Sequence, residues 1–119
     1  MGTDKKVLIV DDNIDAADLT AEYLRVFGAD VSVAYGGAEA LAAARASVPH
    51  VIFLDIGMPG MDGYQVAQAL RADGAFQHVK IIALTAWSDQ ASRDKSQAAG
   101  FDLHLTKPAN LSMLLDLAS

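Results

Sequence analysis

The sequence predicts an α/β fold in which five parallel strands form one doubly wound sheet with helices on both faces. Two observations predict it. Short apolar runs alternate five times with segments of helical periodicity, which is typical of repeated βα units with right-handed crossovers. The runs Val51 to Leu54 and Ile81 to Leu84 contain no polar residue, and such runs indicate strands covered on both faces, as in a parallel sheet.

The first strands and helices are marked by β-branched residues and by a glycine. Lys6 to Val10 is rich in β-branched residues, which favours a strand. Ile14 to Phe27 has apolar residues at helical spacing, and Gly28 supplies the left-handed residue with which many helices end. Val31 to Ala34 is expected to form the second strand. An alanine-rich helix over Ala38 to Ala46 should follow it and end before the next proline.

The middle of the chain predicts two buried strands with a helix between them. Val51 to Leu54 is the third strand, and a loop rich in glycine leads from it into the third helix. Val66, Ala67 and Leu70 form the apolar face of that helix. Ile81 to Leu84 is the fourth strand.

The last part of the chain completes the alternation. A helix is expected from about Asp89 to Ala99, with Ser88 as its N-cap and Gly100 as its stop. Leu103 to Leu105 is the fifth strand, and Leu111 to Ala118 is a final helix capped by the asparagine before it. Since no linker or repeat interrupts the pattern, residues 1–119 are expected to form a single domain.

Composition excludes several classes of function. The formal net charge of -6 and the pI near 4.7 argue against direct nucleic acid binding, which requires clustered Lys and Arg. No apolar run approaches the roughly 20 residues that cross a bilayer, so no membrane contact is expected. The chain has no cysteine and needs no oxidising compartment. The cytoplasm is the expected location.

Polar side chains are expected to meet at one edge of the sheet. Asp11, Asp12, Asp55, Thr85 and Lys107 all lie at or just after the ends of predicted strands. Ligands of open α/β sheets bind beyond the carboxyl ends of the strands. These residues are therefore candidates for one functional site, although the two adjacent aspartates alone could simply favour the start of a helix.

The residue types at this edge favour metal-assisted phosphoryl chemistry. Three neighbouring carboxylates raise one another's pKa unless a cation neutralises them, and an all-oxygen ligand set suits Mg²⁺. A carboxylate such as Asp55 can act as the nucleophile and form an aspartyl phosphate. Lys107 could neutralise phosphoryl oxygens, and the Thr85 hydroxyl could donate to one of them.

Four motifs, taken together and in order, resemble those of bacterial response-regulator receiver domains. They are Val10-Asp11-Asp12-Asn13, Leu54-Asp55-Ile56-Gly57-Met58-Pro59-Gly60-Met61-Asp62-Gly63, Ala83-Leu84-Thr85-Ala86 and Thr106-Lys107-Pro108. The resemblance covers nearly the whole chain and implies a (βα)5 flavodoxin-like fold with strand order 2-1-3-4-5. The second half is most similar to receivers that belong to hybrid sensor histidine kinases or stand alone.

The resemblance implies a phosphoacceptor and a metal site. Asp55 would accept a phosphoryl group from a phosphohistidine on a sensor histidine kinase or a histidine phosphotransfer protein. Asp12, Asp55 and the Gly57 carbonyl would bind Mg²⁺, with Asp11 assisting through water. Enzymatic activity would be limited to Mg²⁺-dependent autophosphorylation and autodephosphorylation.

The resemblance also implies a switch. Thr85 and Lys107 would sense the phosphoryl group and change the surface formed by the fourth helix, the fifth strand and the fifth helix, which would control a separate partner or an attached output domain. A cis peptide bond is expected before Pro108.

Two residues depart from the family pattern. His104 stands where receivers often have a Tyr or Phe switch residue, so it either takes part in switching or simply faces solvent on a short edge strand. Trp87 follows Thr85 by two residues, and its ring could restrict access to the site or bind a partner.

Two other classes of function compete with this interpretation. Aspartate-nucleophile phosphatases of the dehalogenase type use similar residues, but their nucleophile follows the first strand in a motif with a small residue between two acids. Here the acids after the first strand are adjacent. A pseudo-receiver that binds partners without phosphorylation is the second alternative.

Overall fold

The computed structural model describes residues 5–87 and 89–118. Strands and helices alternate along this part of the chain. The strands are β1 (Lys6–Val10), β2 (Asp30–Ala34), β3 (Val51–Asp55), β4 (Lys80–Thr85) and β5 (Leu103–Thr106). The α-helices are α1 (Ile14–Val26), α2 (Gly37–Ala46), α3 (Gly63–Arg71), α4 (Gln90–Ala99) and α5 (Leu111–Ala118), and a short 3₁₀ helix, η1, spans Gly74–Phe76.

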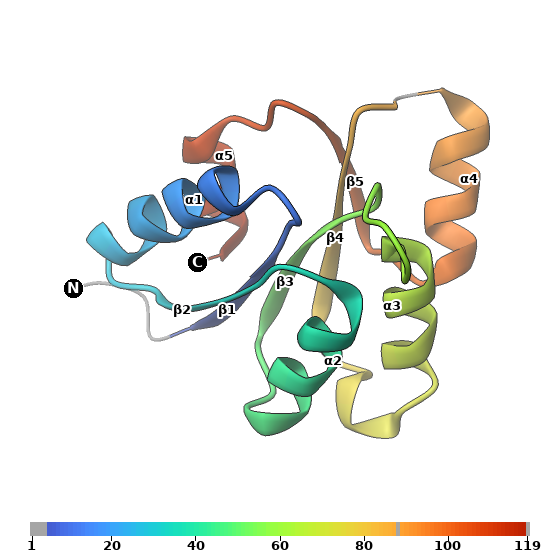
Figure 1. Cartoon of the computed structure of the whole chain (residues 1–119), viewed down its shortest axis with the longest axis horizontal. Coiled ribbons are helices and arrows are strands. Elements are labelled where there is room, and N and C mark those ends of the chain that lie inside the picture. Colours follow the sequence, from blue (N-terminus) through green and yellow to red (C-terminus); the bar gives the residue numbers. More distant parts are fainter. Residues whose placement is uncertain (1–4, 88, 119) are drawn as a thin grey trace.

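The strands form one parallel sheet in the order β2-β1-β3-β4-β5. Helices α1 and α5 cover one face of the sheet, and α2, α3 and α4 cover the other (Figure 1). The predicted fold class and the strand order implied by the family resemblance are therefore confirmed.

The core consists of two layers because alternate residues of each strand point to opposite faces. In β1, Val7 and Ile9 pack with buried residues of α1 and α5, whereas Leu8 and Val10 pack with residues of α2, α3 and α4. This arrangement explains why the central strands are apolar throughout. It also fixes the carboxyl ends of β1, β3 and β4 side by side.

The strands extend slightly further than the sequence predicted. Asp55 and Thr85 are the last residues of β3 and β4, because Asp55 still pairs with Leu84 and Thr85 with Thr106. Sequence patterns place strand ends where apolar residues end, whereas backbone pairing continues into the polar site residues. Helix η1 was not predicted.

The N-cap of α4 was predicted wrongly. Ser88 lies outside the described residues, and Asp89 caps the helix, with its side chain accepting a hydrogen bond from the Ser92 N–H at 3.2 Å. Its other carboxylate oxygen accepts the Ser92 hydroxyl at 2.9 Å, and these bonds lower the pKa of Asp89. The predicted stop at Gly100 is confirmed, since Gly100 has a φ of 107°.

The start of α3 lies directly against the phosphoacceptor candidate. A Cβ atom at Gly63 would lie 2.6 Å from the Asp55 carbonyl oxygen and 2.7 Å from the Ile56 Cα. Both neighbouring atoms belong to the backbone and cannot rotate away. The substitution Gly63→Ala is therefore expected to lower the free energy of unfolding by about 1–3 kcal/mol, as measured by urea denaturation.

The matched control for this substitution is Gly57→Ala. A Cβ at Gly57 would have no heavy atom within 4 Å, so its cost should be much smaller. Equal effects of the two substitutions on stability would contradict the steric account of the tight approach of α3 to β3.

Candidate functional site

A cavity of about 520 Å³ opens at the carboxyl end of the sheet. It is formed by the loops that follow β1, β3, β4 and β5. The residues that line it are Asp11, Asp12, Asn13, Asp55, Gly57, Ala86, Trp87 and Lys107. The expected convergence of the aspartates and the lysine is therefore observed in the structure.

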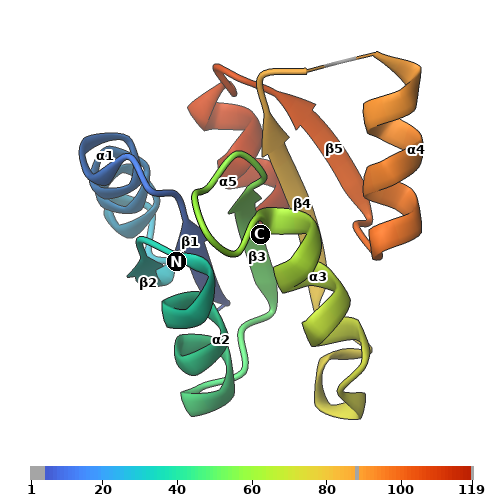
Figure 2. The ribbon, with the colours of Figure 1, turned by 45° about the vertical axis from the view of Figure 1, so that its right-hand side comes forward.

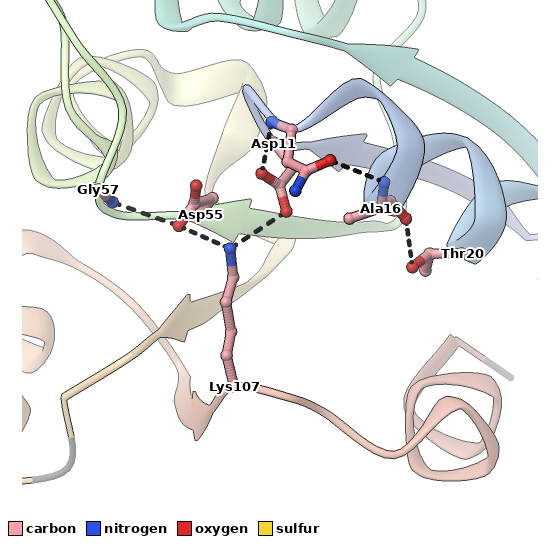
Figure 3. Close-up of polar contacts among 7 residues, drawn as sticks. Asp11, Ala16, Thr20, Asp55, Gly57 and Lys107 are labelled. Carbon is pink, nitrogen blue, oxygen red and sulfur yellow. Dashed lines mark hydrogen bonds and ion pairs between the residues drawn. The ribbon is translucent and has the colours of Figure 1, made fainter.

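Lys107 connects the two buried carboxylates of this cavity. Its Nζ lies 3.2 Å from Asp11 Oδ2 and 3.2 Å from Asp55 Oδ1. Figure 3 shows the lysine extending from the segment after β5 toward both acids. The side chains of Asp11 and Asp55 are each only 8% exposed, so these interactions are screened less than ion pairs at the surface.

The site holds more negative than positive charge. Burial raises the pKa of Asp55, and the Asp11 charge adds to this, while Lys107 opposes it. For Lys107, burial acts to lower the pKa, but the charges of Asp55 and Asp11 outweigh burial and raise it. One protonated lysine thus does not fully compensate the neighbouring acids.

The carboxylates fit a divalent cation. One oxygen from each of Asp11, Asp12 and Asp55 lies within 4.8 Å of the others. Asp12 is exposed at the mouth of the cavity, whereas Asp11 and Asp55 are buried. This all-oxygen set, with space for water in the open cavity, matches the ligand preference of Mg²⁺.

The aspartates after β1 do not cap the first helix. Asn13 is the N-cap of α1, and its side chain accepts from the Ala16 N–H at 3.1 Å. Asp11 Oδ1 accepts from the Asn13 N–H at 2.9 Å, which orients the carboxylate toward the cavity side. Asp12 lines the same cavity and is exposed.

Thr85 lies next to the cavity but does not line it in this structure. The residue is 1% exposed, and its Oγ1 accepts a hydrogen bond from the Trp87 N–H at 3.1 Å. The Thr85 carbonyl accepts from the Lys107 N–H at 2.7 Å. The hydroxyl is therefore close to the site but bound to the loop after β4.

The two residues that depart from the family pattern are linked to each other. Trp87 lines the cavity and is 54% exposed. His104 is half-buried, and its ring nitrogens contact Ser96 Oγ at 2.9 Å and the Trp87 carbonyl at 2.8 Å. His104 thus does not simply face solvent, and its part in switching stays a prediction.

Ser96 was not singled out from the sequence. It lies on α4, is 1% exposed and contacts His104. The signal available in the sequence was its position three residues before the buried Ala99, which places both residues on one face of the helix. The expected cis peptide bond between Lys107 and Pro108 is observed.

The raised pKa of Asp55 leads to a prediction about stability. An acid that holds its proton more strongly in the folded chain contributes stability at low pH, and that stability is lost as the pH rises from the ordinary value of 3.8 through the folded pKa. Without metal at neutral pH, Asp55→Asn is expected to raise the free energy of unfolding by about 1 kcal/mol. The gain should vanish as the pH falls toward the ordinary value.

Urea denaturation in a chelating buffer at several pH values measures this effect. Asp116→Asn is the matched control, because Asp116 is exposed on α5, away from the cavity. A variant Asp55→Asn that is less stable than the wild type at neutral pH would contradict the balance of charges described above.

A parallel sheet of this strand order, with an acidic cavity and a lysine at its carboxyl edge, is the arrangement expected of a receiver domain. The family model described as Response regulator receiver domain matches residues 7–119. The chain therefore belongs to the response regulator receiver domain family, whose members act as switches in two-component signalling.

Individual relatives agree with this assignment. The chain is 34% identical to Protein PilG of Pseudomonas aeruginosa, covering 92% of this chain and 82% of PilG. It is 38% identical to Response regulator PleD of Caulobacter vibrioides, covering 92% of this chain but only 24% of PleD. The chain thus spans about a quarter of that longer regulator.

Solved structures give the same result. The chemotaxis protein CheY4 of Vibrio cholerae superposes with a TM-score of 0.91 at 32% identity, covering 97% of this chain and 96% of that chain.

Within residues 5–87 and 89–118, no helix has the length and apolar character needed to cross a membrane.

Proposed function

We propose that Asp55 is the phosphoacceptor of this receiver domain and that Asp11, Asp12, Asp55 and the Gly57 carbonyl hold Mg²⁺ beside it. The observation that carries the proposal is the position of Asp55. Asp55 is buried at the end of β3 and lines the cavity. Its Oδ1 lies 3.2 Å from the Lys107 Nζ, and its carboxylate belongs to the cluster of three.

The transfer step uses one oxygen of Asp55. Oδ1 accepts hydrogen bonds from Lys107 Nζ at 3.2 Å and from the Gly57 N–H at 3.3 Å, which leaves Oδ2 as the attacking atom. Oδ2 forms a bond to the phosphorus of a phosphohistidine. The bond from phosphorus to the imidazole nitrogen breaks, and that nitrogen keeps the electron pair.

The other residues neutralise charge around the transferred group. Lys107 already bridges Asp11 and Asp55, so a small movement would let it bind a phosphoryl oxygen. Bound Mg²⁺ would supply a second centre of positive charge for the carboxylates and the phosphoryl oxygens. Gly57 lines the same cavity, and a Cβ placed on it would have no heavy atom within 4 Å.

Membership of the family supports a wider role. We propose that residues 1–119 act as a single receiver domain in the cytoplasm and accept the phosphoryl group from a sensor histidine kinase or a histidine phosphotransfer protein. Thr85 and Lys107 would then change the surface of α4, β5 and α5, and through it a separate partner or an attached output domain. An attached output domain is supported by two longer relatives, since the chain covers only 24% of PleD and 48% of Transcriptional regulatory protein PrrA of Mycobacterium bovis.

Intact mass spectrometry tests the proposed function. The protein is incubated with a small phosphodonor, with Mg²⁺ in one sample and with excess chelator in the other. The expected result is a gain of one phosphoryl group only in the sample with Mg²⁺, because the unneutralised carboxylates repel the donor. A folded protein that gains no phosphoryl group with any donor or metal would instead be a pseudo-receiver.

A further inference from the structure

We propose that Asn13 positions the phosphodonor in the cavity, with its side-chain Nδ2 donating a hydrogen bond to a peripheral oxygen of the phosphoryl group as that group approaches Asp55. The inference rests on the proposed function of Asp55 and deepens it. It concerns a separate question, namely which uncharged group of the chain binds the incoming phosphoryl group.

Two hydrogen bonds hold Asn13 at the edge of the cavity. Its backbone N–H donates to Asp11 Oδ1 at 2.9 Å, and its side-chain Oδ1 accepts from the Ala16 N–H at 3.1 Å. The first bond ties Asn13 to a buried acid of the site, and the second ties it to the first turn of α1. Asn13 lines the cavity together with Asp11 and Asp55.

Helix α1 is a firm support for this side chain. Ala17, Ala21 and Leu24 are its buried residues, and they pack with buried residues of the sheet and of α5. Figure 2 shows the chain passing from β1 into α1 at the edge of the sheet where the loop after β3 also lies. A donor that is fixed before the reaction loses little conformational freedom when its ligand arrives.

The helix cap fixes the orientation of the side-chain amide. A backbone N–H only donates, so the atom of Asn13 that faces the Ala16 N–H is the carbonyl oxygen and not the nitrogen. Nδ2 is attached to the same planar carbon and is therefore turned away from that N–H. Asn13 is exposed, and within the described part of the chain the structure shows no acceptor bound to Nδ2. Its hydrogens are thus accessible to a ligand.

Other donors of the cavity are already bound to carboxylates. Lys107 Nζ lies 3.2 Å from both Asp11 and Asp55, and the Gly57 N–H donates to Asp55 Oδ1 at 3.3 Å. Thr85 does not line the cavity in this structure. A phosphoryl group in transfer spreads its charge over three peripheral oxygens, so a donor that is not held by an acid can bind one of them directly.

An amide suits this cavity because it carries no charge. An N–H of Asn13 can bind a phosphoryl oxygen without competing with Mg²⁺ for the carboxylates, as the Lys107 ammonium does. Asp would cap the helix as well as Asn, but it would add negative charge to the acidic cluster and could not donate. Capping therefore does not distinguish Asn from Asp at position 13, whereas phosphoryl binding does.

Two substitutions separate the donor from the cap. Asn13→Ser and Asn13→Asp both keep a side-chain oxygen that can accept from the Ala16 N–H, but both lack the amide N–H. Asn13→Ala removes the cap and the donor together. The matched control is Asn110→Ser, because Asn110 caps α5 by accepting from the Ser112 N–H at 2.9 Å and does not line the cavity.

The rate of phosphoryl uptake is measured by intact mass at saturating Mg²⁺ and subsaturating phosphoramidate, which carries the same phosphorus–nitrogen bond as a phosphohistidine. Asn13→Ser is expected to be about three- to tenfold slower than the wild type, as the loss of one hydrogen bond implies. Asn13→Asp should be slower still, because its charge repels an anionic donor. Asn110→Ser should keep the wild-type rate.

Melting temperature and Mg²⁺ affinity show whether the effect belongs to the donor. Asn13→Ser should melt near the wild type, whereas Asn13→Ala should melt at a lower temperature because α1 loses its cap. The fluorescence of Trp87, the only tryptophan of the chain, reports Mg²⁺ binding. The affinity should be unchanged in Asn13→Ser, because no carboxylate of the cluster is removed, and higher in Asn13→Asp.

Several results would overturn the proposal. Uptake by Asn13→Ser at or above the wild-type rate would show that Asn13 only caps the helix. Slower uptake that comes with weaker Mg²⁺ binding would assign the effect to the metal site, and an equal loss in Asn110→Ser would assign it to capping in general. These outcomes require a wild type that is phosphorylated. Absence of uptake by the wild type would refute the proposed function of Asp55 instead.

Discussion

Replacement of Asp55 by asparagine is expected to abolish phosphoryl uptake, with a loss of at least about 10³-fold. An amide has no anionic oxygen to attack phosphorus, and no other carboxylate of the cavity has the same surroundings. Asp11 is oriented by the Asn13 N–H and held by Lys107, and Asp12 is exposed. The time course of intact mass with donor and Mg²⁺ measures the effect.

Loss of folding cannot explain this result, because Asp55→Asn is expected to be more stable than the wild type without metal. Asp116→Asn, which removes an exposed charge far from the cavity, should keep the wild-type rate. Uptake by Asp55→Asn at a rate near that of the wild type would mean that another residue accepts the phosphoryl group.

Lys107→Gln is expected to slow phosphoryl uptake by about 10²–10³-fold, the usual effect of removing one charged donor from a developing anion. Lys107 is the only cation among the described residues that line the cavity. The same substitution should tighten Mg²⁺ binding, because the ammonium lies 3.2 Å from two of the carboxylates and competes with the metal. Trp87 fluorescence during a Mg²⁺ titration measures the affinity.

Slower phosphoryl uptake combined with tighter Mg²⁺ binding would distinguish the loss of the Lys107 charge from a general disturbance of the site. Lys80→Gln is the matched control, since Lys80 is exposed at the opposite end of β4. If Lys107→Gln weakened Mg²⁺ binding, the lysine would support the metal site and not compete with it.

The main part of the site could be predicted from the sequence because strand ends determine it. Asp11, Asp55 and Lys107 lie at or just after the ends of three different strands, and parallel strands bring their carboxyl ends to one edge. Helical periodicity and buried apolar runs were sufficient to locate those ends within one residue. No knowledge of side-chain orientation was required.

The interactions around the loop after β4 could not be predicted in this way. The bond from Trp87 to Thr85 depends on the path of an irregular backbone, and the contact between His104 and Ser96 depends on how α4 packs beside β5. Neither contact produces a periodic pattern in the sequence. The prediction of the N-cap of α4 was wrong for a similar reason. Ser and Asp both cap helices, and only the path of the loop decides which of them does so.

The position of Asp55 illustrates a conflict between stability and function. Burial and the neighbouring Asp11 raise the pKa of Asp55, so the charged carboxylate is destabilising in the metal-free fold. The same surplus of negative charge attracts a divalent cation to this edge of the sheet, and neutralisation by the cation lets an anionic phosphoryl donor approach. Loss of stability at such a site is common where chemistry requires it.

Borohydride trapping tests most directly whether the phosphoryl group resides on Asp55. Borohydride reduces an acyl phosphate to an alcohol, so an aspartyl phosphate becomes homoserine, which peptide mass mapping locates. We expect homoserine at position 55 after incubation with donor and Mg²⁺, and none in the sample with chelator. Homoserine at position 11 or 12, or a phosphorylated protein with none at 55, would contradict it.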